Sequence, residues 1–238
     1  MKKLSWSTIK SIVKSYRLGS YLREFSIVAG GVLFTFWGSN MINENARQKE
    51  VHETMLLVIK ELKYNQNSLE KIINLTDKDV YMSSLLIQNN LDITSIPKDT
   101  LYKYPKLFSN LSSLEYRKDA LEVLKGSSLM QYISNKQMLQ EILQTYYQLE
   151  QEQENIDSYY TLKKDILYET ALSKNKAEIL MNKNTELYNQ VLYLMNKPRF
   201  LTFITIVPSF LDWEELEELN RQLKEQIKTL ENYYSASI

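Results

Sequence analysis

Apolar residues recur along the chain with the period of an α-helix. After position 44 they follow alternating steps of four and three residues, and Asn65 fills the one polar slot among Val51, Met55, Val58, Leu62, Leu69 and Ile72. This spacing lines up one helix face that must pack on another helix. Because neither Gly nor Pro stands between Ser39 and Thr76, we expect one helix to run through this whole stretch.

A second stripe of the same period begins near Asn135. Its members are Leu139, Ile142, Tyr146, Leu149, Gln153, Ile156, Tyr160 and Leu167. We expect another helix through Glu178 to Met195, and a last one, capped near Ser209 or Asp212, that carries Leu216, Leu219, Leu223, Leu230 and Tyr233. The first two stripes predict a bundle core at Val51, Met55, Val58, Leu62, Leu139, Ile142, Tyr146 and Leu149.

Shorter signals mark the boundaries between these helices. Asp77 can cap a second helix, and Ser95 to Pro105, which contains two prolines, is the clearest loop. Ser113 lies near another helix start, and Gly126 marks the end of that helix. With only 5 Gly and 4 Pro, the chain has little turn chemistry for hairpins, so we predict an all-α fold in which residues 45–238 form an antiparallel helical bundle.

The stretch from Phe200 to Leu211 does not fit these patterns. Phe203, Ile204, Ile206 and Val207 would be apolar on both faces of a strand, and Pro208 interrupts a helix. The stretch is too short to cross a membrane. Three interpretations stay open: a plug in the core, a patch that binds a partner, and a segment that dips into the bilayer.

A charge-free window lies near the N-terminus. No charged residue stands between Phe25 and Asn43, and at about 1.5 Å per residue a helix of this length covers most of the roughly 30 Å of a hydrocarbon core. We therefore predict a transmembrane helix at 21–44 that continues into the long helix. The alternatives are a buried helix or a cleaved signal peptide, which is disfavoured because its cleavage site would place Trp37 at position −3.

Charge around this window predicts its orientation. Six basic residues precede it, namely Lys2, Lys3, Lys10, Lys14, Arg17 and Arg23, and few follow closely. By the positive-inside rule, residues 1–20 are cytoplasmic and 45–238 lie outside, in the periplasm of a bacterial inner membrane. Residues 1–20 also show a basic amphipathic pattern that suits an anionic leaflet, although a topology signal alone explains the charges equally well.

Small residues form a stripe inside the predicted membrane helix. Gly31, Thr35 and Gly38 recur at steps of four and three. Small side chains let two helix backbones approach closely in lipid, so we take these three positions as candidates for helix packing in the membrane. Glycines that simply face lipid are the alternative.

The residues that carry chemistry are sparse. The chain has no Cys, and His52 is its only histidine, so thiolate sites and histidine pairs for a metal are excluded. Carboxylate runs such as Glu214 to Glu218 have the spacing of solvated helix faces. Beyond the membrane helix acidic residues outnumber basic ones, which disfavours nucleic-acid binding. We expect no cofactor, no metal and no enzymatic activity.

Two blocks of residues resemble a known family. Arg23-Glu24-Phe25, Ile27-Val28, Gly31-Val32 and Asn43-Glu44 look like the opening of a domain-of-unknown-function family of single-pass membrane proteins from Bacteroidota, and the stretch Leu121 to Tyr147 is similar to its second recurring block. The chain departs from the family at Ile42, where a Trp is usual, and at Ser127-Ser128, where a Gly is common. The resemblance implies an inner-membrane location and the same topology, and it implies no activity.

Together these signals predict a membrane-anchored helical protein that interacts with or holds a partner. Its expected partners are the lipid bilayer and either another protein or a second copy of the chain. A helical bundle can also bind a small molecule between its helices. The alternative is therefore a ligand sensor outside the cytoplasm that signals through a partner protein.

Overall fold

The computed structural model describes residues 18–171 and 187–235, apart from the side chains of residues 18–25, 36–40, 42, 106, 170, 171 and 187. The described residues form helices and no strands, as predicted, and the chain divides into two compact units, Met1–His52 and Glu53–Ile238. Two expectations fall on residues outside this description. Of residues 1–20, where the amphipathic pattern is expected, only the backbone from residue 18 onward is described, and the helix start expected at Glu178 is not described. The elements in chain order are α2 (Leu18–Gln88), η1 (Ile93–Ser95), α3 (Lys98–Lys103), α4 (Lys106–Ser109), α5 (Asp119–Gly126), η2 (Leu129–Tyr132), α6 (Lys136–Ala171), α8 (Leu187–Met195), α9 (Pro198–Phe210) and α10 (Trp213–Ser235).

Helix α2 is continuous over 71 residues, which confirms the unbroken helix expected from the lack of Gly and Pro. The helix start expected at Asp77 is wrong, because Asp77 is an exposed residue inside α2 and no breaker precedes it. The helix ends instead at Gln88, and Asn90 and Leu91 follow it with left-handed φ angles of 53° and 61°. There the Leu91 N–H donates to the Leu86 carbonyl over 2.8 Å, the usual way in which a left-handed turn closes a helix.

Helix α2 exposes a run of apolar side chains in the first unit. From position 26 to 35 almost every residue is exposed, and the apolar ones include Leu33 at 70% and Phe34 at 72%. Among the residues that the structure describes, no helix combines the length and the apolarity needed to span a bilayer. Within the charge-free window, the side chains at 25, 36–40 and 42 lie outside that description.

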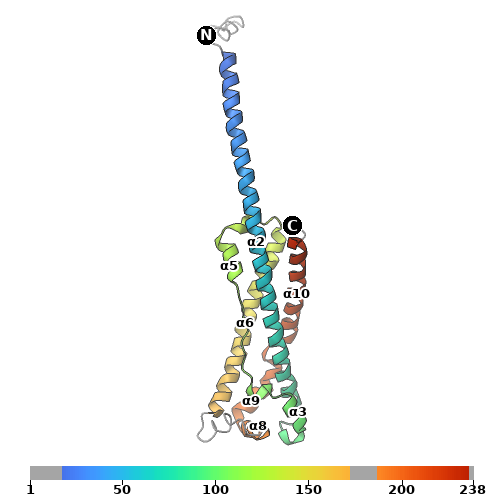
Figure 1. Cartoon of the computed structure of the whole chain (residues 1–238). Coiled ribbons are helices and arrows are strands. Elements are labelled where there is room, and N and C mark those ends of the chain that lie inside the picture. The colour runs from blue at the N-terminus through green and yellow to red at the C-terminus, as the bar shows by residue number, and fades with distance from the viewer. Residues whose placement is uncertain (1–17, 172–186, 236–238) are drawn as a thin grey trace, which may run out of the picture. The chain divides into compact units, whose positions relative to one another are not determined.

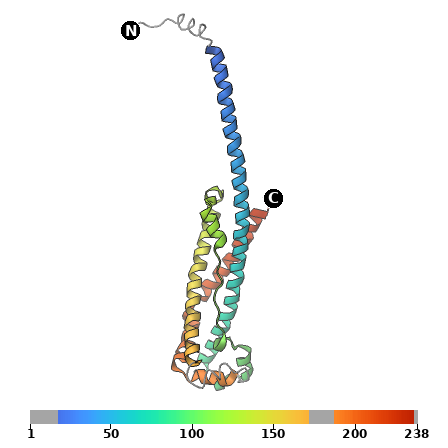
Figure 2. The same ribbon diagram turned by 60° about the vertical axis from the view of Figure 1, so that its left-hand side comes forward.

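Three long helices lie side by side in the second unit: residues 53–88 of α2, α6 and α10 (Figures 1 and 2). Helix α10 runs antiparallel to α2, because Lys63 pairs with Glu231 and Glu70 pairs with Lys224. Helix α6 runs parallel to α2, as its contacts from Glu61 to Tyr146 and from Asp79 to Lys163 advance together along both helices. The expected antiparallel order therefore holds for α10 and is wrong for the α2–α6 pair.

The parallel order requires the chain to return along the bundle between α2 and α6. Residues 110–118 make this return without forming a helix, so the helix start expected near Ser113 is wrong, whereas α5 does end at Gly126 as predicted. Asn65 fastens the returning segment to α2. Its amide donates to the Arg117 carbonyl over 2.7 Å and its carbonyl accepts from the Arg117 N–H over 2.9 Å. The polar slot in the first stripe is thus a backbone clamp.

The ambiguous stretch from Phe200 to Leu211 is mainly helix α9. Its apolar face, Phe200, Phe203, Ile204 and Val207, is buried, and α9 packs against α6 and α8. Pro198 occupies the first turn, where its missing N–H costs nothing, and Pro208 lies in the last turn, where few helical residues follow. This burial supports the interpretation of the stretch as a core plug.

Caps set the starts of the two other long helices where the sequence suggested. The Asn135 side chain accepts from the Met138 N–H over 3.0 Å at the start of α6, and the Asp212 side chain accepts from the Glu215 N–H over 3.1 Å at the start of α10. Ser209, the other candidate cap, lies inside α9. The buried face of α10 ends at Tyr234 rather than at Tyr233, because the step after Leu230 is four residues.

Candidate functional site

Seven of the eight residues of the predicted bundle core belong to the second unit, and Val51 belongs to the first. Val51, Met55, Val58, Leu62, Leu139, Ile142, Tyr146 and Leu149 are all buried. The unexpected feature of this interior is that ionisable side chains share it. Two polar centres join α2 to the rest of the bundle, one at Glu61 and one at Asp79.

Glu61 is a buried carboxylate that caps another helix. It accepts hydrogen bonds from the Ala120 N–H over 2.9 Å and from the Leu121 N–H over 3.4 Å, both in the first turn of α5. A negative charge at this end of a helix is favourable because the first N–H groups lack partners inside the helix. The Tyr146 hydroxyl donates to the same carboxylate over 2.6 Å, so Glu61 ties α5 and α6 to α2.

The Tyr146 hydroxyl is held in its neutral form. Burial is the main cause that raises its pKa, and the hydrogen bond to Glu61 raises it further. The Tyr116 hydroxyl donates to the Tyr146 carbonyl over 3.2 Å, and burial raises the pKa of Tyr116 as well. The two tyrosines therefore serve as neutral donors that satisfy buried acceptors.

An open groove lies on the outer side of the Glu61 centre. Its volume is about 570 Å³, and apolar Leu57 and Val123 share it with Lys60, Tyr64 and Arg117. The Arg117 guanidinium lies 3.6 Å from the centroid of the Tyr64 ring, a cation–π contact, and the Tyr64 hydroxyl donates to Glu115. The groove thus combines an apolar surface with two cationic side chains and with the carboxylates of Glu61 and Asp119.

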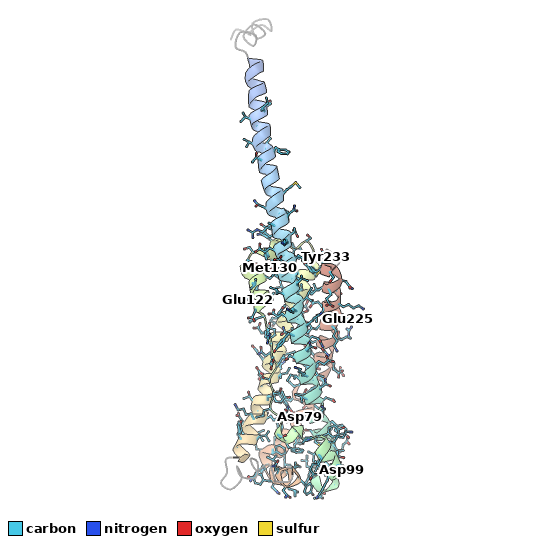
Figure 3. The ribbon with its side chains drawn as sticks, viewed as in Figure 1. Asp79, Asp99, Glu122, Met130, Glu225 and Tyr233 are labelled. Atoms are coloured by element: carbon cyan, nitrogen blue, oxygen red, sulfur yellow. The ribbon has the colours of Figure 1, made fainter. Side chains whose placement is uncertain are left out.

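The second centre is an ion pair without solvent access. Lys163 on α6 lies 2.6 Å from the Asp79 carboxylate on α2, and both side chains have an exposure of 0%. The Tyr159 hydroxyl donates to the same oxygen of Asp79 over 2.9 Å. Figure 3 shows Asp79 toward the end of the bundle where α3 and α9 lie. Burial, and then the charge of Asp79, raise the pKa of Tyr159, so this hydroxyl is also a neutral donor.

Aromatic rings enclose the Asp79 centre. The Tyr159 ring lies 5.9 Å from Phe203 and 5.5 Å from Phe210, both on α9. The Lys163 ammonium lies 5.6 Å from the centroid of the Tyr160 ring and 6.0 Å from that of Tyr159. Helix α9 therefore closes the end of the bundle over the ion pair, and the centre is built to hold helices together rather than to admit a substrate.

The sequence contained a signal for these groups. When the first stripe is extended by further steps of four and three beyond Ile72, it reaches Thr76, Asp79, Ser83 and Leu86, all of which are fully buried. Lys163 falls in the same way between Tyr160 and Leu167 on the second stripe. A search for apolar residues alone overlooks these positions. Glu61 stands one place before Leu62, outside the strict spacing, and has no comparable signal.

The membrane-packing candidates Gly31, Thr35 and Gly38 belong to the first unit. Gly31 and Thr35 are exposed, and the Thr35 hydroxyl donates to the Gly31 carbonyl over 2.8 Å. A Cβ added at Gly31 meets nothing within 4 Å. Gly38 lies among the residues whose side-chain surroundings are not described. Within the described part of the chain, no group of three or more His, Cys, Asp or Glu side chains could hold a metal ion.

Comparison of the chain with protein-family models, with curated proteins and with solved structures finds no match. The resemblance to the Bacteroidota family therefore remains an expectation from the sequence, and the argument for function rests on the residues themselves.

Proposed function

We propose that this protein is a scaffold anchored in the bacterial inner membrane by one N-terminal helix, with a helical bundle outside the cytoplasm that holds or positions a partner protein. The observation that carries the proposal is the exposed apolar surface of α2 between positions 26 and 35, within a run that has no charge from Phe25 to Asn43.

This apolar surface surrounds the helix. Ile27, Val28, Val32, Leu33 and Phe34 are each at least half exposed, and successive helical residues are rotated by about 100°, so the five point in all directions. Covering one such side chain contributes roughly 1.5–3 kcal/mol. A single partner helix covers only a stripe, whereas lipid covers every side. The arrangement therefore favours lipid as the surroundings of this segment.

Features of the second unit support a scaffold. The Asp79 centre is sealed by protein and Glu61 is buried, and the charges and hydroxyls of both centres are engaged in joining α2, α5 and α6. A bundle fastened in this way presents a firm surface to a partner. The basic residues before the charge-free run favour a cytoplasmic N-terminus, so the bundle would lie in the periplasm.

The groove beside Glu61 favours a second candidate function. Its lining places the cations Lys60 and Arg117 and the carboxylates Glu61 and Asp119 beside apolar surface, which suits a small molecule with both polar and apolar parts. A bundle that senses such a ligand would have to pass the signal to a partner. The groove is open to solvent and the anchor surface does not depend on it, so we rank this function second.

The anchor and its orientation can be tested together. In membranes from cells that express the full chain, we expect the protein to resist extraction at alkaline pH and to dissolve in detergent. A reporter enzyme that is active only outside the cytoplasm should work when fused after Ile238 and fail when fused before Met1. Release from the membrane at alkaline pH, or activity of the N-terminal fusion alone, would overturn the proposal.

Purification of the solubilised chain on an affinity tag separates the two functions. A protein partner at near-stoichiometric amount supports the scaffold. A copurified small molecule that is lost in the variant Arg117→Ala supports the sensor. Recovery of the chain with neither would contradict both.

A further inference from the structure

The three long helices of the second unit leave three outer seams, and two of them are closed. The seam between α2 and α10 is bridged by the ion pairs Lys63–Glu231 and Lys224–Glu70 and by the Gln66–Asn220 hydrogen bond of 3.1 Å. The seam between α2 and α6 is covered by residues 110–118 and by α5, which Asn65 and Glu61 fasten to α2.

The seam between α6 and α10 is open. A groove of about 330 Å³ runs along it, with Met138, Thr145 and Leu230 as its buried floor. The walls carry Gln and Glu side chains at helical spacing from both helices: Glu141, Gln144, Gln148, Gln222, Glu225 and Gln226. Among the described residues, none of the side chains that line the groove forms a hydrogen bond or ion pair with the opposite helix. The walls are therefore available to a third element.

The charged side chains that line this groove are acidic. No basic residue lines the groove, whereas Glu141 and Glu225 do, and Figure 3 shows Glu225 directed outward from α10. Farther along, the buried carboxylate of Glu152 on α6 lies near Asp212 and Glu215. Arg221 pairs with Glu225 in the wall of the groove and with Glu218 beside it. The seam as a whole is acidic.

This charge selects the occupant. A second copy of the same seam would bring acidic walls together and is disfavoured, and an anionic lipid surface is disfavoured for the same reason. A basic helix fits both the charge and the shape. Its apolar residues would reach the floor formed by Met138 and Leu230, its Lys or Arg side chains would pair with Glu141 and Glu225, and the glutamines would serve as donors and acceptors.

We infer that the α6–α10 seam is the surface on which this protein docks a basic amphipathic helix of a partner protein. The inference rests on the proposed scaffold function and deepens it, because it names the surface and the chemistry of the partner.

The test uses the purified full chain in a zwitterionic detergent, which supplies no anionic lipid. The probe is a synthetic amphipathic peptide of about 15 residues, long enough to form a helix, with Lys on its polar face and a fluorophore and a photo-crosslinker attached. Its twin has Glu in place of every Lys. Binding is followed by fluorescence anisotropy at low and high salt, and the crosslinked residues are identified by mass spectrometry.

We expect the Lys peptide to bind, to crosslink within residues 138–148 and 222–230, and to lose affinity at high salt, while the Glu twin does not bind. The double variant Glu141→Lys, Glu225→Lys should weaken binding at least tenfold. The matched control, Glu154→Lys with Glu217→Lys, makes the same charge change at exposed positions of the same helices away from the groove, and it should shift affinity less than threefold. If the double variant unfolds, Glu141→Gln with Glu225→Gln replaces it, with a smaller loss expected.

Absence of binding, equal losses in the groove and control variants, or crosslinks outside the seam would overturn the inference. These outcomes are distinct from failure of the scaffold. A chain that copurifies with a protein partner but does not bind the peptide in the seam remains a scaffold with another docking surface, whereas a chain that binds no partner at all loses both.

Discussion

Asp79 on α2 and Lys163 on α6 form an ion pair of 2.6 Å that has no contact with solvent, and the Tyr159 hydroxyl completes it. Two buried charges cost much in desolvation, so such a pair adds little net stability compared with apolar residues of the same volume. Replacing only one of the two residues lowers the free energy of unfolding strongly, because the remaining charge stays buried without its partner. The pair therefore specifies how α6 lies on α2.

The substitution Lys163→Met should lower the free energy of unfolding by about 3–5 kcal/mol, because it strands the Asp79 carboxylate. The control Lys164→Met changes the next residue, which is exposed, and should cost less than about 0.5 kcal/mol. Adding Asp79→Asn to Lys163→Met should recover most of the loss, since the asparagine oxygen can still accept from Tyr159. Urea denaturation of the three variants measures this, and equal midpoints for Lys163→Met and Lys164→Met would refute it.

A charge in the core stripe should destabilise the bundle. Ile142 is fully buried and Tyr147, on the same helix, is 62% exposed. We expect Ile142→Asp to cost several kcal/mol because it buries a carboxylate without a partner, and Tyr147→Asp to stay within about 0.5 kcal/mol. Thermal unfolding followed by circular dichroism checks both. Similar melting temperatures for the two variants would show that the stripe is not core.

Alkaline pH should unfold the bundle. Burial raises the pKa of Tyr116, Tyr146, Tyr159, Tyr160 and Tyr234, in the last case to about 12. The unfolded chain releases these protons near pH 10 while the folded chain keeps them, so stability is full below pH 10 and falls as pH rises above it. Each tyrosine contributes about 1.4 kcal/mol per pH unit. Urea midpoints measured from pH 8 to 11 should show this loss, and midpoints that stay constant across this range would contradict it.

Replacing Glu152 should stabilise the protein at neutral pH. Burial raises the pKa of this carboxyl group, and the charges of Glu215 and Asp212 raise it further, so its ionised form is unfavourable in the folded state. The variant Glu152→Gln removes that charge and should gain on the order of 1 kcal/mol, or roughly 2–4 °C in Tm. The gain should vanish below the ordinary carboxyl value of 4.5, where Glu152 is protonated in both states. The exposed control Glu154→Gln should show no gain at any pH.

Self-association of the proposed membrane helix gives a further prediction. A Cβ at Gly30 or at Gly31 meets no atom within 4 Å, so the same substitution can be made at neighbouring positions that point about 100° apart. If the stripe of Gly31, Thr35 and Gly38 mediates contact, Gly31→Ile and Gly38→Ile lower the signal of a transmembrane reporter carrying residues 21–44, and Gly30→Ile does not. A wild-type signal equal to that of a monomeric control would rule out the homodimer.

The elements that the sequence predicted well are those with a local cause. Neither Gly nor Pro interrupts α2 between Ser39 and Thr76, the stripe from Leu139 to Leu167 marks α6, and Asn135, Asp212 and Gly126 mark helix ends through their own side chains or lack of one. The helix start predicted at Asp77 is wrong because an Asp side chain caps a helix only where a helix begins, and α2 is continuous through this position.

The direction of α6 and the polar centres depend on contacts between distant residues. Whether residues 110–118 form a helix or return along the bundle is decided by Asn65 and Ser68 on α2, which bond to Arg117 and Glu115. The pairing of Asp79 with Lys163 likewise joins residues far apart in the chain. Asp79 falls on the extended stripe of α2 and Lys163 on the stripe of α6, but the spacing does not predict which residue of one stripe contacts which residue of the other. The open α6–α10 seam also appears only once all three helices are in place.

The parallel order of α2 and α6 has a consequence for how the protein folds. In an up-and-down bundle each helix can dock on its neighbour through a short turn, so most contacts are close in sequence. Here α6 can contact Asp79 and Glu61 on α2 only after residues 89–135 have returned along the bundle. This long connection raises the contact order and the entropy cost of bringing α2 and α6 together. Folding should therefore be slower than is usual for a helical protein of this length.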